Sequence, residues 1–268
     1  MNKGQYFSAL LSFLMISSPA HLSAGELGGA KEYERLLNLL AEKPTTASIG
    51  MVASGYGAHS GQLFAAVTYS DVDLQTDTAG DDDGSIVIGL GLGDPVTSIG
   101  VESVLGITSV STQFWGDGQF ADEGNFSLKL HKMIKPIGGF DSASVSLGAS
   151  NLLGWGSTKE QPTNYYVSYS SRKAIGAYKQ YSLGYTIGYG SASSELETSA
   201  AFYGGVGIAR NGYSVSLSRL EDVTNFNVNY EIPFVDNLSV SYSRTDILDT
   251  TGSARNIVSI GYSTNIFQ

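Results

Sequence analysis

A strict two-residue alternation runs through QYSLGYTIGYG at residues 180–190. One side of this stretch carries large groups, at Tyr181, Leu183, Tyr185, Ile187 and Tyr189. From residue 182 onward the other side carries only Ser, Thr and Gly. Successive side chains on an extended strand point to opposite faces. The alternation therefore predicts a β-strand with one large apolar face and one small polar face.

The composition indicates what covers the apolar face. Exposed strand faces of soluble proteins usually carry Lys, Glu and Arg, but charged residues make up only 15% of this chain, which has instead 33 Gly and 16 Tyr. We therefore expect the large side chains to face lipid. Because hydrocarbon tolerates no unpaired backbone edge, the sheet must then close on itself. A soluble β-sandwich is the alternative that this composition disfavours.

The same alternation recurs along most of the chain. It predicts strands at 62–74, 85–94, 97–112, 124–135, 141–151, 164–172, 180–190, 201–210, 213–220, 224–232, 237–245 and 255–267, with a weaker candidate at 46–57. Short links alternate with longer or more polar ones, an arrangement typical of transmembrane β-barrels with short turns on one rim and long loops on the other.

Strand parity then selects a topology. Bacterial single-chain barrels have an even number of strands, and counting back from a periplasmic end of the last strand leaves 46–57 as the odd segment. We predict an all-β, closed, antiparallel up-and-down transmembrane β-barrel of twelve strands within 46–268. Its strands begin at 62, and 46–57 runs inside or beneath the barrel. A barrel of fourteen strands is the alternative.

The N-terminal region differs from the strands. Residues 1–24 have an early Lys, an apolar run and a small-residue end, so we expect a secretory signal peptide cleaved after Ala24. Residues 25–45 form a separate segment, in which Tyr33, Leu36, Leu37 and Leu40 have the spacing of a short amphipathic helix. Pro44 ends this predicted helix.

Charge and cysteine content exclude several classes. The chain has no Cys and a formal net charge of −10, which becomes more negative when Lys3 leaves with the signal peptide. An acidic chain makes nucleic-acid partners unfavourable, and disulfide-stapled secreted domains need Cys. No mature segment has 18 consecutive apolar residues, so no membrane helix is expected. We expect no cofactor.

The order of these features resembles that of Gram-negative outer-membrane β-barrel proteins of the porin-like class: a signal peptide, a helical N-terminal piece, a strand series and an amphipathic last strand. The resemblance implies an outer-membrane location and assembly by the barrel-assembly machinery, which usually reads a terminal aromatic residue. Here Phe267 is penultimate and Gln268 is last. A barrel with an N-terminal segment in its lumen is also similar to hydrophobic-solute transporters such as the fatty-acid channel family. No motif of this chain is specific enough to assign functional residues from that family.

Three candidate lumen residues lie on adjacent predicted strands. Glu102 faces inward on 97–112, and Lys129 and His131 face inward on 124–135. Hairpin pairing brings Glu102 opposite the 129–135 stretch, which predicts a polar network of these three side chains. The network either braces the wall or forms a constriction that selects solutes.

Other charged residues are assigned to the exterior. Arg219 and Arg244 fall on the lipid-facing side near the outer strand ends, where arginine reaches headgroups at little cost. Their side chains either extend along the surface to the lipid headgroups without a specific partner or bind lipopolysaccharide phosphates. Asp81, Asp82 and Asp83 are weak metal candidates, because the carboxylates suit calcium but lack EF-hand spacing. We interpret them as a solvated loop.

Three functions follow from these features. The first is an outer-membrane channel for passive or gated passage of small solutes through a small-polar lumen, since twelve strands enclose more space than such side chains fill. The second is a structural or recognition protein without conductance, with loop-mediated contacts. The third, a barrel-embedded lipid enzyme, lacks a catalytic set. Ser127 lies about 13 Å from His131 along an extended strand, too far for a direct hydrogen bond, so we do not expect an enzyme.

Overall fold

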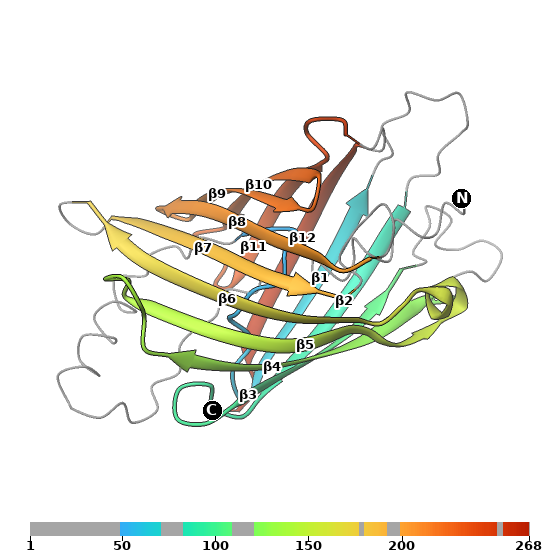
Figure 1. Cartoon of the computed structure of the whole chain (residues 1–268), viewed down its shortest axis with the longest axis horizontal. Coiled ribbons are helices and arrows are strands. Elements are labelled where there is room, and N and C mark those ends of the chain that lie inside the picture. Colours follow the sequence, from blue (N-terminus) through green and yellow to red (C-terminus); the bar gives the residue numbers. More distant parts are fainter. Residues whose placement is uncertain are drawn as a thin grey trace.

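The computed structural model describes residues 49–70, 83–108, 121–176, 180–191, 199–250 and 254–267. In this part of the chain, twelve antiparallel strands form a closed barrel (Figure 1). The strands are β1 (Gln62–Ser70), β2 (Asp83–Leu92), β3 (Gly100–Ile107), β4 (Gly124–Ile134), β5 (Ser142–Trp155), β6 (Asn164–Ile175), β7 (Tyr181–Gly190), β8 (Ala201–Arg210), β9 (Tyr213–Leu220), β10 (Val223–Glu231), β11 (Leu238–Thr245) and β12 (Arg255–Asn265).

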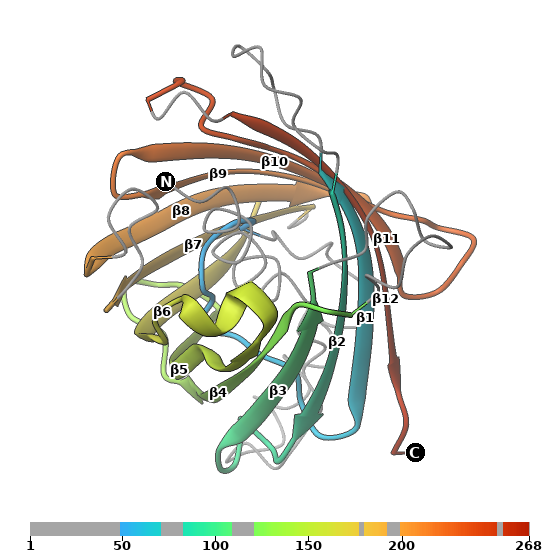
Figure 2. The ribbon, with the colours of Figure 1, turned by 90° about the vertical axis from the view of Figure 1, so that its right-hand side faces the viewer.

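Every strand pairs with its neighbours in sequence, and β1 pairs with β12 from Gln62–Asn265 to Ser70–Ile257 (Figure 2). The predicted closed barrel of twelve strands is confirmed. Because the first and last strands are hydrogen-bonded to each other, the wall has no position for two further strands. The fourteen-stranded alternative is therefore wrong.

The two faces of each strand become the two faces of the wall. On β9, Ser214, Ser216 and Ser218 are buried while Val215 and Leu217 are exposed. Other large apolar side chains exposed on the outside include Val67, Ile88, Leu147, Ile187, Val206 and Ile260. Small polar groups thus face the interior, and an apolar surface surrounds the barrel.

The turns use residues that accept a left-handed backbone. Between β8 and β9, Asn211 and Gly212 have φ of 49° and 85°. Two successive residues at positive φ suit the two-residue hairpin turns that match the twist of paired strands. In the β2–β3 turn, the Asp94 carboxylate accepts hydrogen bonds from the Val96 amide (2.9 Å) and the Thr97 hydroxyl (2.8 Å).

The pairing of β4 with β5 is irregular. The register shifts between Phe126 and Leu128, and Asn151 has φ of 53°, with its amide donating to the Ser127 hydroxyl (3.1 Å). Strand β5 continues beyond the predicted end at 151 and leads into a short 3₁₀ helix, η1 (Gly156–Glu160), which lies at the end of the barrel nearest the viewer in Figure 2.

No helix in the described ranges is both long and apolar enough to cross a bilayer. The predicted signal peptide at 1–24 and the predicted helix within 25–45 lie outside the described residues.

Candidate functional site

Residues 49–61, named here the lumenal segment, precede β1 and run inside the ring of strands, where Figure 2 shows them in blue. The segment contacts the wall from β9 round to β2. Gly50 bonds to β9, and Gly61 donates from its amide to the Gly91 carbonyl of β2 (3.0 Å). No strand is assigned within 49–61. The barrel interior is therefore occupied by a non-strand piece of the chain.

Serine hydroxyls of the wall hold the main chain of this segment. The Gly55 amide donates to the Ser170 hydroxyl (2.8 Å), and the Gly55 carbonyl accepts from Ser144 (2.7 Å). The Ser54 carbonyl accepts from Ser146 (3.0 Å), and the Gly50 amide donates to Ser216 (3.2 Å). These contacts use backbone groups, so they satisfy polar atoms that burial would otherwise leave unpaired.

Glycines allow this close approach. A Cβ on Gly55 would lie 2.3 Å from the Ser144 carbonyl oxygen, and one on Gly50 would lie 2.8 Å from Asn227 Cγ. A Cβ on Gly91 would lie 2.1 Å from the His59 carbonyl oxygen. At such distances backbone or side chains must shift, so segment and wall are fitted to each other.

An ion pair closes one part of the site. Glu102 and Lys129 face each other across β3 and β4, with Lys129 Nζ 2.7 Å from Glu102 Oε1. Lys129 also donates to the Tyr56 carbonyl (2.9 Å), and the Ala58 amide donates to Glu102 Oε2 (2.7 Å). Both side chains are almost completely buried, at 2% and 3% exposure. Each charge thus has an opposite charge and a backbone partner from the lumenal segment.

His131 lies beside this pair but does not join it. Its ring packs on two glycines: a Cβ on Gly57 would lie 2.7 Å from the ring, and one on Gly100 would lie 2.5 Å from it. The ring is buried, and neither nitrogen has a hydrogen-bond partner. The structure therefore brings Glu102 and Lys129 into contact, with His131 as an adjacent packing group.

Tyr56 adds a second attachment on the same side. Its hydroxyl lies 2.8 Å from Ser142 Oγ, and the guanidinium of Arg172 lies 4.0 Å from its ring centroid. A cation over an aromatic face is attractive, more so away from water. Sequence reasoning missed Tyr56, Arg172 and the serines as one site. The run of small residues SGYGA at 54–58, which suits close packing against a wall, is the pattern that could have indicated it.

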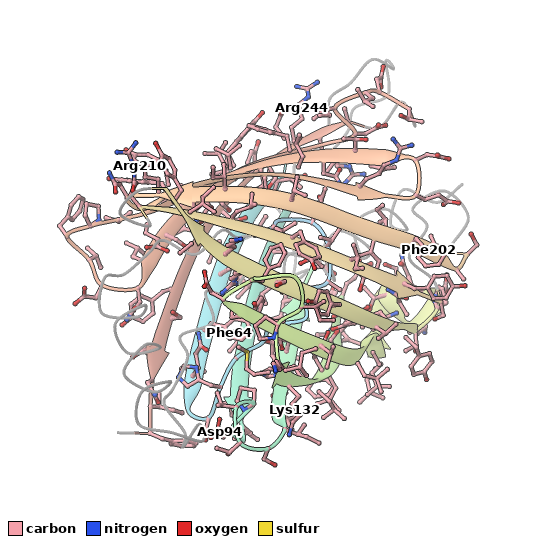
Figure 3. All side chains as sticks on the ribbon, turned by 60° about the vertical axis from the view of Figure 1, so that its left-hand side comes forward. Phe64, Asp94, Lys132, Phe202, Arg210 and Arg244 are labelled. Carbon is pink, nitrogen blue, oxygen red and sulfur yellow. The ribbon has the colours of Figure 1, made fainter. Side chains whose placement is uncertain are left out.

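The exterior arginines already have partners. Arg219 donates from Nε to the Glu221 carbonyl (2.7 Å) and lies 3.5 Å from the Asp222 carboxylate. Arg244 projects from the outside of the barrel in Figure 3, and its guanidinium lies 3.4 Å from Asn256 Oδ1. Both lie on the outer face of the wall close to a strand end, Arg219 one residue before the end of β9 and Arg244 one residue before the end of β11.

The remaining candidates are placed as follows. Asp81 and Asp82 lie outside the described residues, as does the side chain of Asp83, whose backbone begins β2. Ser127 accepts a hydrogen bond from Asn151, and the His131 nitrogens bond to no serine in the residues that the structure describes. No Ser–His pair is therefore formed at this position.

A closed barrel with an even number of antiparallel strands, an apolar exterior and a largely polar interior has the architecture of outer-membrane, porin-like β-barrels. This assignment of the architecture depends on the strands of the wall and not on the lumenal segment.

Comparisons with known proteins find neither a matching protein-family model nor a matching curated protein. Solved structures give weak likenesses. A KdgM porin in complex with disordered oligogalacturonate is 12% identical, with 75% of this chain and 99% of that chain covered and a TM-score of 0.44. An outer membrane channel from Pseudomonas putida F1 is 8% identical, with 78% and 97% covered and a TM-score of 0.47. The CymD monoaromatic hydrocarbon channel is 9% identical, with 95% of this chain and 99% of that chain covered and a TM-score of 0.39. Because every one of these TM-scores is below 0.5, we infer nothing about this chain from these structures.

Proposed function

We propose that this protein is an outer-membrane channel for small solutes and that its own lumenal segment narrows the passage. The observation that carries the proposal is the combination of a wide barrel with a separable occupant. Eight strands already suffice for an interior filled by side chains, whereas this wall has twelve. The added interior holds a non-strand segment.

The nature of the attachment supports gated passage. Each wall hydroxyl that bonds the segment contributes about 0.5–1.5 kcal/mol net. The segment is thus held by several modest contacts and by two hydrogen bonds to the charged groups of Glu102 and Lys129. Such an occupant can shift without opening the sheet, because no strand pairing depends on it.

The outer surface supports insertion in a bilayer. Tyr181 and Tyr189 of β7 are about 21 Å apart along the barrel axis, at about 3.4 Å per residue and roughly 40° of tilt. Aromatic contacts occur near both ends: Tyr213 stacks on Tyr230 at 4.4 Å, and Tyr189 contacts Phe202 at 4.8 Å. Aromatic girdles about 25 Å apart border the apolar band of membrane barrels.

Within this proposal the arginines mark the outer rim. Arg219 and Arg244 would lie at headgroup height, where lipopolysaccharide phosphates are available to their guanidinium groups. The Glu102–Lys129 pair would be the polar constriction, since it joins the wall to the lumenal segment.

A second candidate is an envelope protein without conductance. The low exposure of inward-facing groups such as Glu102, Ser144 and Ser170 favours it, because a lumen that stays filled would pass nothing.

The test is current across a planar lipid bilayer containing the purified full-length chain. We expect small current steps from the wild type and larger or more frequent steps from the double variant S144A/S170A, which loses the two hydroxyls that bond Gly55. Thr68→Val is the matched control, since the Thr68 hydroxyl bonds to Ser259 of the wall (3.0 Å) and, among the described residues, to none of the lumenal segment. Silence from both the wild type and the double variant would favour the second candidate and overturn the first.

A further inference from the structure

Apolar side chains meet inside the barrel, where the alternation of the sequence predicts mostly small polar groups. They form one contiguous buried cluster. Its wall members come from β1–β3, with Phe64, Val87 and Val104, and from β6, β8 and β9, with Tyr166, Tyr203 and Leu220. We name these six wall residues the apolar belt. Figure 3 shows Phe64 within the ring of strands.

The aromatic members of the belt lie flat against the wall. A Cβ on Gly89 would lie 2.0 Å from Phe64 Cζ, and one on Gly188 would lie 2.3 Å from Tyr203 Cζ. Each ring therefore covers a glycine of the neighbouring strand with one face. Both rings are also buried members of the cluster, so they have apolar neighbours inside the barrel.

The present partners of the belt are small side chains of the lumenal segment. Ile49, Val52, Ala53 and Ala58 belong to the same buried cluster. Their positions are set by the main-chain bonds at Gly50 and Gly55. If those bonds break and the segment shifts, the belt loses its cover. Apolar surface exposed to water is unfavourable by roughly 25 cal/mol per Å², so the belt then favours another apolar occupant.

The polar groups beside the belt carry no net charge. Ser127 faces Val104 across β3 and β4, and the Tyr203 hydroxyl lies 2.5 Å from Ser168 Oγ. The neighbouring charges, Glu102 and Lys129, compensate each other at 2.7 Å. A solute that fits these surroundings has an apolar body and a neutral, hydroxyl-bearing head.

We propose that the apolar belt is a binding subsite for the apolar body of a small neutral amphiphile, such as an aryl or branched-alkyl group bearing hydroxyls. This body replaces the side chains of Ile49, Val52 and Ala53. This subsite rests on the proposed channel function and assigns a solute class to it. Solutes with the same polar head but without an apolar body pass without pausing there.

The experiment compares two solutes with one head group, p-nitrophenyl β-glucoside and methyl β-glucoside, as blockers of single-channel current through the full-length protein in a planar bilayer. We expect the aryl glucoside to reduce the current at about tenfold lower concentration, because only its ring is buried on the belt. Val104→Thr and Val87→Thr, near-isosteric changes that add a hydroxyl, should each remove most of this difference. Val215→Thr on the outer face of β9 is the control and should keep it.

The outcomes separate the two proposals. Equal block by both glucosides, or an aryl preference unchanged in both belt variants, would overturn the subsite and leave the channel standing. Absence of current from both the wild type and S144A/S170A would overturn the channel function and the subsite with it. A preference lost in Val87→Thr alone still supports the subsite if Val104→Thr does not fold.

Discussion

Two ion pairs of this protein differ in what surrounds them. Glu102 and Lys129 are 2.7 Å apart and buried in the lumen. Arg219 and Asp222 are 3.5 Å apart, with 60% and 59% of their side chains exposed. Burial removes the water that would stabilise a lone charge, so losing one partner costs far more inside the barrel than on its surface.

Glu102→Gln should therefore lower the free energy of unfolding by about 3–5 kcal/mol, the range for breaking a buried pair. Asp222→Asn, in the exposed pair, should change it by less than about 1 kcal/mol. Urea unfolding of the protein in lipid vesicles measures both. The double variant E102Q/K129M should recover part of the loss, because it leaves no uncompensated charge. Similar small effects of the two single variants would mean that the lumen pair is hydrated.

The same Glu102→Gln variant also tests the pair as a constriction. It frees Lys129 from its counter-charge, so single-channel current should become more selective for anions. Unchanged conductance and ion preference would limit the pair to a bracing role.

Only half of this site could be predicted from the sequence. Period-two alternation placed Glu102 and Lys129 on inner faces of adjacent strands, because a hairpin determines which residues are opposite. The backbone partners at Tyr56 and Ala58 were not predictable, since a segment without regular periodicity carries no information about its register against a wall. The packing of His131 on Gly57 and Gly100 was not predictable for the same reason, because Gly57 belongs to that segment.

At the scale of elements, aromatic rings on one strand cover glycines on the next. Tyr203 of β8 lies over Gly188 of β7, and Tyr166 of β6 lies over Gly148 of β5, with Cβ-to-ring distances of 2.3 Å in both cases. Both rings lie on the inner face of the wall, as members of the apolar belt.

Gly188→Ala should lower stability by about 1–3 kcal/mol, because the new methyl group overpacks the site and displaces the Tyr203 ring. Gly261→Ala on β12 is the matched control, since its Cβ would meet nothing closer than 3.4 Å. Thermal unfolding in detergent micelles compares the two. The combination G188A/Y203S should be less destabilised than the sum of its single changes, and full additivity would contradict the contact.

All twelve strand regions were predictable from alternation because most outward side chains are large and apolar and most inward ones are small and polar. Their ends were less so. Strand β5 runs on to Trp155, past an irregularity at Asn151, and exposed Leu152 and Leu153 are adjacent, which breaks the period. The 3₁₀ helix η1 has five residues, too few to show helical periodicity.

The barrel as a whole followed from parity and from the need to close the sheet. Its apolar belt did not, because isolated inward residues such as Phe64 and Val87 look like ordinary variation when most inward positions are Ser or Gly. Their convergence is a property of the closed wall, which brings residues of β1–β3 and of β6, β8 and β9 together around one segment.

The surroundings of the outer face can be tested at this scale. Val206, in the middle of β8, is 56% exposed. If lipid covers it, Val206→Arg should cost about 2–4 kcal/mol, whereas Phe202→Arg at the rim should cost about 0–1 kcal/mol beyond the lost ring. Unfolding in phospholipid vesicles measures both. In a water-exposed barrel the Val206→Arg substitution would be nearly neutral, which would contradict membrane insertion.

Pairing of β1 with β12 encircles the residues that lead into β1. Residues 49–61 can therefore reach their places by two routes: they dock while the sheet is still open, or they enter through an end of the finished ring. In the first route the wall closes around the segment, and the serine contacts form together with the seam.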